Sequence, residues 1–147
     1  AAKFYLSRAA PREKDTIREA IQVAQEVSSA LKSSGEVEEA FDAMLLVVGA
    51  KMTLNETDEA LKVVVELKSS APSAKCALQA LRREVAVNLE LGEVDKALEV
   101  ARAGQAELEQ KGDAEVVAGL WSVLADALHA KGEEAEATEA RIKAAAN

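Results

Sequence analysis

Residues 92–98 read GEVDKAL, and residues 35–41 read GEVEEAF. In both stretches a Gly is followed at once by an acidic residue, and a small Ala and then a larger apolar residue come five and six positions after the Gly. Gly readily adopts the left-handed conformation that ends a helix, and acidic residues are favoured in the first turn of the next helix. Both stretches therefore predict the same tight turn between two helices.

Similar breaker residues divide the whole chain into segments of comparable length. Between the breakers, apolar residues recur at helical spacing. In the first segment these apolar residues are Ile17, Ile21, Ala24, Val27 and Leu31. The breakers are Pro11, Gly35, Asn55, Pro72, Gly92, Gly112 and Gly132. The pattern predicts helices over residues 12–34, 36–53, 56–70, 73–91, 93–110, 113–131 and 133–146.

The composition agrees with an all-α fold class. Aromatic residues make up 3% of the chain and prolines number two, whereas Ala, Leu, Val, Glu and Lys dominate, which is typical of packed helices. The predicted connections are short, so neighbouring helices are expected to run antiparallel. We expect an α-solenoid of antiparallel helix hairpins, with a closed helical bundle as the alternative.

The spacing of small residues predicts the length of the repeat. Ala20, Ala60, Ala97 and Ala137 are separated by 40, 37 and 40 positions, which fits a two-helix repeat of about forty residues. GEVEEAF precedes GEVDKAL by 57 positions, about one and a half repeats. The two stretches are therefore expected at different phases, with GEVDKAL inside a hairpin and GEVEEAF between two hairpins.

The strongest pattern near the C-terminus is W-x2-L-A-x2-L-x3-G-x4-A. Its residues are Trp121, Leu124, Ala125, Leu128, Gly132 and Ala137. This pattern resembles the tetratricopeptide repeat (TPR), and a length near forty residues is similar to the longer-repeat subclass of that family. Glu84 and Asn88 depart from the resemblance, because the family is apolar at the corresponding positions.

The resemblance implies a right-handed α-solenoid. Its hairpins would span residues 36–70, 73–110 and 113–146, preceded by the helix over residues 12–34. A single TPR-like domain is expected over residues 11–147, with residues 1–10 as an N-terminal arm or partial helix.

The resemblance also implies a concave groove lined by first-helix residues, which in the family receives an extended peptide or a partner helix. The residues expected to line this groove are Leu45, Gly49, Met52, Arg82, Ala86, Leu89, Ser122, Asp126 and His129. A second candidate is the N-terminal arm, in which Phe4 and Tyr5 are two of the four aromatic residues of the chain. Because aromatic and Arg side chains are favoured anchors at interfaces, Phe4, Tyr5 and Arg8 are expected to dock onto a larger assembly. The alternative is that the arm covers the end of the solenoid.

The sequence does not predict enzymatic chemistry. Asp126 and His129 lie three positions apart on one helix, but no nucleophile, Gly-rich oxyanion loop or third group accompanies them. A metal would need further ligands, for which Glu133 is only a weak candidate. Cys76 lies among apolar residues and is expected to be a small buried hydrophobe. We therefore expect no catalytic residue, no cofactor and no metal site.

Charge and hydropathy bound the choice of partners. The net charge of −8 divides into +3 on residues 1–18 (five basic, two acidic) and −11 on the rest, so the acidic body is expected to repel nucleic acid. The longest apolar run, AMLLVVGA at residues 43–50, is too short to span a bilayer, so we expect a soluble chain without membrane insertion. A single cysteine is compatible with a reducing compartment. The start at Ala1 instead of Met is expected of a processed chain, an organellar one included, or of an excised piece.

Three functions are compared. The leading hypothesis is a non-catalytic scaffold or adaptor for protein–protein interaction, built from TPR-like repeats. The second is an accessory structural subunit of a large multi-protein complex, which would not purify alone as a monomer. The third is a small helical enzyme or ligand-binding bundle that uses Asp126, His129 and Cys76, and loss of a measured activity in His129→Ala would favour it. The sequence assigns no oligomeric state.

Overall fold

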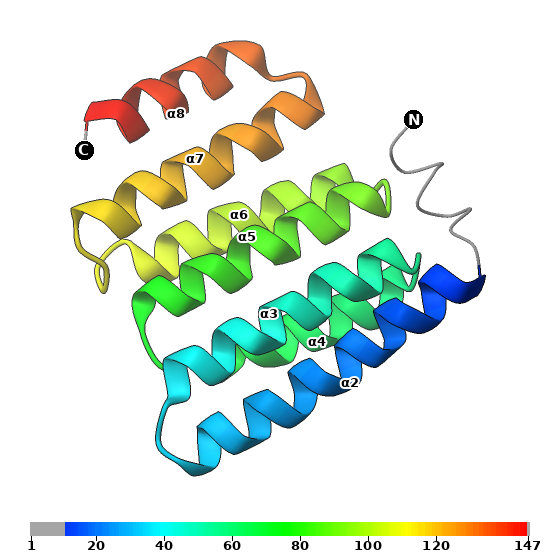
Figure 1. The fold of residues 1–147 in the computed structure, drawn as a ribbon. Helices are drawn as coiled ribbons and strands as arrows, with labels where there is room; N and C mark the ends of the chain where they lie inside the picture. Colours follow the sequence, from blue (N-terminus) through cyan, green and yellow to red (C-terminus); the bar gives the residue numbers. More distant parts are fainter. Residues whose placement is uncertain (1–10, 147) are drawn as a thin grey trace. The chain divides into compact units, whose positions relative to one another are not determined.

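The computed structural model describes residues 11–146, and every regular element in that range is an α-helix (Figure 1). The helices are α2 (Pro11–Ser33), α3 (Val37–Thr53), α4 (Thr57–Ser69), α5 (Ala74–Glu90), α6 (Val94–Leu108), α7 (Ala114–Lys131) and α8 (Glu134–Ala146). No observed end lies more than two residues from the predicted one. The all-α class and the seven predicted helices are confirmed for this range, whereas the choice between solenoid and closed bundle stays a prediction. No helix in the described part has the length and apolar character needed to span a bilayer.

The turns that end α2, α3, α5 and α7 are built alike. At each turn a backbone N–H donates to the carbonyl oxygen five residues earlier, at 2.8–2.9 Å. The donor and acceptor pairs are Glu36 to Leu31, Glu56 to Lys51, Glu93 to Asn88, and Glu133 to Leu128. The residue before each donor has positive φ, which is +86° at Gly35, +78° at Gly92 and +63° at Asn55. GEVEEAF and GEVDKAL therefore form the same helix-ending turn, in which Asn is able to replace Gly.

Side-chain caps start the two helices that carry most of the predicted groove residues. At the start of α5, Ser73 Oγ accepts a hydrogen bond from the Cys76 backbone N–H at 3.2 Å. At the start of α7, Asp113 Oδ1 accepts one from the Val116 N–H at 3.0 Å. Each cap satisfies a backbone donor that the helix itself leaves unpaired. The capped ends fix where α5 and α7 begin.

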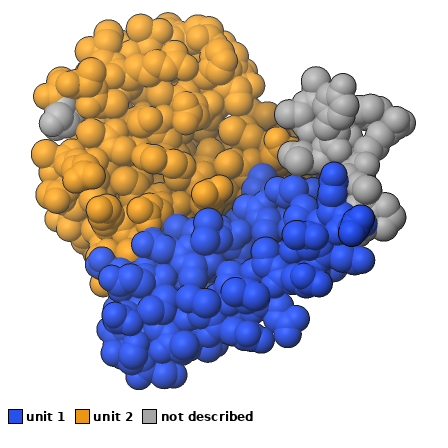
Figure 2. All heavy atoms as spheres, viewed as in Figure 1, with its two compact units in different colours: residues 1–67 blue, residues 68–147 orange. Residues whose placement is uncertain are grey.

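The chain divides into two compact units, residues 1–67 and residues 68–147 (Figure 2). In the first unit, α2 packs against α3 around Ile21, Val47 and Leu54. Val27 shares the helical spacing of Ile17, Ile21, Ala24 and Leu31, but Val27 is 45% exposed, and the neighbouring Ser28 is buried instead. Ser28 tolerates burial because its hydroxyl donates to the Ala40 carbonyl oxygen at 2.9 Å.

In the second unit, α5, α6, α7 and α8 run alternately up and down, and each packs on the next (Figure 1). α5 also packs on α7, so these two helices lie side by side and run in the same direction. One apolar core joins all four helices. Its buried members include Leu81 on α5, Ala101 on α6, Leu120 and Leu124 on α7, and Ala137 on α8. This packed platform supports the exposed residues described next.

Candidate functional site

Three of the predicted groove residues form one exposed row along α7. Ser122, Asp126 and His129 stand four and three positions apart, so they share a face of the helix, and all three are exposed. The opposite face carries Leu120 and Leu124, which belong to the core of the second unit. The row is therefore presented on a helix whose other side is fixed by packing.

Arg82 on α5 belongs beside this row. Arg82 is exposed, and its Nη2 atom lies 3.4 Å from the position that a Cβ at Gly119 would take. Gly119 stands three positions before Ser122 on α7, and Leu78 of α5 fills the space that a side chain at Gly119 would need. Because Gly119 has no side chain, α5 is able to approach α7 closely and Arg82 reaches across it. Gly119 is not among the predicted site residues, although a Gly inside an otherwise strongly apolar helix is a sequence signal for such a close approach.

The remaining predicted groove residues differ in exposure. Leu89 on α5 is half-buried and packs against the core of the second unit. Leu45 and Met52 lie on α3, where Leu45 is only 8% exposed and Met52 is half-buried. Leu45 therefore offers little surface to a partner. The predicted docking residues Phe4, Tyr5 and Arg8 lie outside the described residues.

The C-terminal end of α7 is held by polar side-chain contacts. His129 Nδ1 lies 2.5 Å from Glu134 Oε1 of α8, so the nearest acidic partner of the imidazole is Glu134. Lys131 Nζ donates to Asp95 Oδ1 at the start of α6. This hydrogen bond and the charge of Asp95 raise the pKa of the Lys131 ammonium above its ordinary value. No group of three His, Cys, Asp or Glu side chains within residues 11–146 is arranged to hold a metal ion.

A small hollow in the second unit, of about 250 Å³, is lined by residues of α6, α7 and α8. Half-buried Trp121 lies in it, and Lys143 Nζ stands 4.5 Å from the centroid of the indole ring. On its rim, Arg102 Nη2 and Glu136 Oε2 are 3.4 Å apart and join α6 to α8. The ring packs against the core and its face is occupied by a cation. These contacts give Trp121 a structural role in holding α7 and α8 together.

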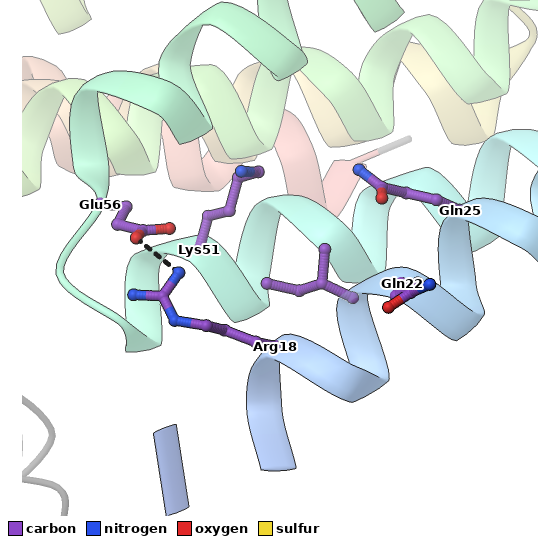
Figure 3. Close-up of a pocket in the computed structure, with 6 residues that line it drawn as sticks. Arg18, Gln22, Gln25, Lys51 and Glu56 are labelled. Atoms are coloured by element: carbon purple, nitrogen blue, oxygen red, sulfur yellow. Dashed lines mark hydrogen bonds and ion pairs between the residues drawn. The ribbon is translucent and has the colours of Figure 1, made fainter. Parts of the chain in front are cut away.

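A second, open hollow of about 480 Å³ lies in the first unit (Figure 3). Arg18 points across it toward Glu56, with Arg18 Nη1 and Glu56 Oε2 at 3.0 Å. Lys51, which also lines it, pairs with Glu59 at 3.2 Å. Both cations of this hollow therefore face carboxylates already. The pairs join α2 and α3 to the start of α4, and the hollow presents no uncompensated charge for an anionic ligand.

The two polar residues that depart from the TPR resemblance lie in the interior of the second unit. Glu84 is buried, and its Oε1 lies 2.5 Å from Lys68 Nζ. This ion pair compensates the charge of Glu84, although the two atoms do not have the geometry of a hydrogen bond. Asn88 is 0% exposed; its Nδ2 donates to the Glu84 carbonyl oxygen at 3.0 Å, but its Oδ1 has no hydrogen-bond partner within residues 11–146. Cys76 is also buried, as predicted, and it is a free thiol. Burial removes all three side chains from contact with a partner.

A scan of the sequence against protein-family models finds no matching family, and a search of curated proteins finds no matching relative.

Proposed function

We propose that this chain is a non-catalytic, TPR-like scaffold that binds another protein through the face formed by α5 and α7. The observation that supports the proposal is the exposed polar row Ser122, Asp126 and His129, with Arg82 reaching across from the adjacent helix. These side chains stand on two helices that pack in one core, so their positions relative to one another are set by that packing, which favours recognition of a partner.

The chemistry of the face favours a peptide segment over a small molecule. Arg82 supplies a planar cation and Asp126 an anion, whereas Ser122 and His129 supply hydrogen-bonding groups. These groups are spread along two parallel helices, so an extended or helical segment of a partner would meet several of them in succession. A segment that carries both an acidic and a basic side chain would satisfy Arg82 and Asp126 together.

Site-specific photo-crosslinking tests this proposal. A photoreactive amino acid replaces Asp126 in one variant and Glu107, an exposed residue of α6, in the control. After irradiation in native extract, a discrete protein crosslinked from position 126 but not from position 107 is expected. With that protein in hand, a calorimetric titration of Asp126→Lys should show affinity at least about tenfold weaker, the effect of losing a contact worth more than 1 kcal/mol. Equal crosslinking from both positions, or unchanged affinity in Asp126→Lys, would refute binding by this face.

We also infer a second candidate, an accessory subunit held inside a larger complex. Large apolar side chains are exposed on several helices, among them Val23 on α2, Leu46 on α3 and Ile142 on α8. A subunit that neighbours cover on several sides would bury all of them. Light scattering of the purified chain separates the two functions: a well-behaved monomer supports the scaffold, and aggregation that a co-purifying chain prevents supports the accessory subunit.

A further inference from the structure

Helix α2 carries a row of residues covered by α3 and an adjoining row of small and β-branched residues that no described residue covers. The covered row faces α3 and consists of Ile17, Ile21, Ala24, Ser28 and Leu31. The other row begins one residue earlier along the helix and is exposed throughout. Its residues are Thr16, Ala20, Val23, Val27 and Ala30. We call this second row the open row of α2.

The open row has the spacing of a helix–helix seam. Its members follow one another by four, three, four and three positions, the alternation that brings one side of a helix into continuous contact with a second helix. Val23 is 57% exposed and Val27 is 45% exposed. Val is also a poorer helix former than Ala or Leu, so solubility and helix propensity both fail to account for its use here. The spacing and the residue types together favour a helix as the ligand of this row.

Two carboxylates follow the outer edge of the open row. Glu19 and Glu26 are exposed and stand one position before Ala20 and Val27. In a pair of packed helices, residues at this position face the flanking side chains of the partner helix and select them by charge. Among the described residues, Glu26 accepts a hydrogen bond from a neutral donor of its own helix, the Gln22 Nε2 at 3.4 Å. The open row is therefore complementary to a helix with Lys or Arg along its flank.

Two other occupants fit less well. A second copy packed antiparallel would set Glu19 and Glu26 of one chain against the same glutamates of the other, and like charges at these positions are unfavourable. If residues 1–10 folded back as a helix after a loop of about three residues, they would cover about 10 Å of α2. Val23 lies twelve positions beyond Pro11 (23 minus 11), or about 18 Å along the axis. Such a helix would leave Val23 and Val27 open.

We propose that the open row of α2 binds an amphipathic helix of a partner protein, whose apolar side packs on Val23 and Val27 and whose Lys or Arg flank faces Glu19 and Glu26. The proposal shares with the proposed function only the premise that the ligand is a protein. The surface is a different one, on the first unit instead of on α5 and α7.

Two synthetic helical peptides of about three heptads serve as probes. They share one Leu and Ala seam, and they differ only in carrying Lys or Glu at the flanking positions. Fluorescence anisotropy with the full chain, at an ionic strength of about 0.05 M where surface charges are weakly screened, should show the Lys peptide binding at least about tenfold more tightly than the Glu peptide. The double variant Glu19→Lys/Glu26→Lys should reverse this preference.

A second double variant, Val23→Ser/Val27→Ser, removes the apolar part of the open row. It should weaken binding of the Lys peptide at least about tenfold while circular dichroism stays that of the unmodified chain, because both valines are exposed. The matched control is Ile142→Ser, which removes a 63% exposed apolar side chain from α8 and should leave the affinity unchanged. Retained affinity in the valine variant, or an equal loss in the control, overturns the proposal.

Three further outcomes would also overturn it. Equal affinity of the Lys and Glu peptides would show that Glu19 and Glu26 do not select the partner helix by the charge of its flank. Sedimentation detects dimers of the chain. If dimers form as the concentration rises, and Val23→Ser/Val27→Ser abolishes them, the open row is assigned to a second copy. Tenfold tighter peptide binding after deletion of residues 1–10 would assign it to the chain's own N-terminal segment. None of these outcomes bears on crosslinking from position 126, so failure here and failure of the proposed function are told apart.

Discussion

The packing of α6 against α5 is tested by Gly104→Ala. Gly104 is buried in the interior of α6, and a Cβ at this position would lie 2.5 and 2.6 Å from the two methyl carbons of Leu81. Helix propensity alone would make the substitution stabilising by about 1 kcal/mol. Leu81 is 0% exposed and has no solvent-filled space to move into, so overpacking should cost about 1–3 kcal/mol. The expected net effect is a loss of about 0–2 kcal/mol in the free energy of unfolding.

A double-mutant cycle separates the two effects. Leu81→Ala alone should cost about 2–5 kcal/mol, because it opens a cavity in the core. In that background Gly104→Ala no longer meets the Leu81 methyl groups, so it should stabilise the chain by about 1 kcal/mol. The sign of the Gly104→Ala effect is therefore expected to reverse, with a coupling of about 1–3 kcal/mol between positions 81 and 104.

Urea unfolding followed by Trp fluorescence provides the measurement. Trp121 is the single tryptophan of the chain and lies in the same unit as both substitutions, so its emission reports on the relevant core. Ala103→Gly, at the exposed neighbouring position of α6, calibrates helix propensity and should cost about 1 kcal/mol. A coupling below about 0.5 kcal/mol, together with stabilisation by Gly104→Ala in the unmodified chain, would show that Leu81 does not pack against Gly104.

Three other substitutions test single features of the structure. Asn88→Leu removes a buried acceptor that has no partner among the described residues, and it also removes the hydrogen bond from Asn88 Nδ2 to the Glu84 carbonyl oxygen. The two effects should nearly cancel, so the free energy of unfolding should change by less than about 1 kcal/mol, and a loss above about 2 kcal/mol in urea unfolding would mean that Asn88 Oδ1 is bonded. Gly92→Ala should cost about 1–2 kcal/mol and Gly92→Asn less, because φ is +78° there; equal costs would contradict the left-handed turn. Asp95→Asn should lower the pKa of Lys131 measured by NMR. Asp95 raises the pKa of Lys131 in the folded chain, so the stabilisation that Asp95 provides should be full below about pH 10.5 and vanish as the pH rises through the raised pKa. A difference in urea midpoint between the variant and the unmodified chain that does not change with pH would contradict this prediction.

The helices and turns could be predicted from the sequence because their causes are local. Gly35, Gly92 and Asn55 each stand where a helix must end in a left-handed residue, and an acidic residue follows within the next turn. Close approaches between helices were not predictable in this way. Gly104 and Gly119 look alike in sequence as glycines inside helices, and only the folded chain shows that Leu81 meets one and Leu78 meets the other.

The candidate site was predicted less completely, for the same physical reason. Ser122, Asp126 and His129, which the TPR resemblance assigned to the groove, are spaced by four and three positions and lie on one exposed side of α7. The burial of Leu45 and the pairing of His129 with Glu134 depend on neighbouring helices, which residue spacing within one helix does not encode. The ion pair of Lys68 with Glu84 likewise joins residues sixteen positions apart (84 minus 68) and has no signature in either helix alone.

The pattern of burial along α2 is informative about function. Val27 has the apolar spacing of the α2 residues that face α3, yet the structure buries Ser28 instead, and the Ser28 hydroxyl donates a hydrogen bond to the Ala40 carbonyl oxygen. A polar residue with a good internal acceptor is therefore able to hold an interior position, and the displaced Val27 is left on the surface. Had Val27 been a single misplaced side chain, it would need no explanation. Because Val23 and the alanines of the open row share its side of α2, the same one-residue shift exposes a continuous seam, and a second helix is the simplest structure that would cover it.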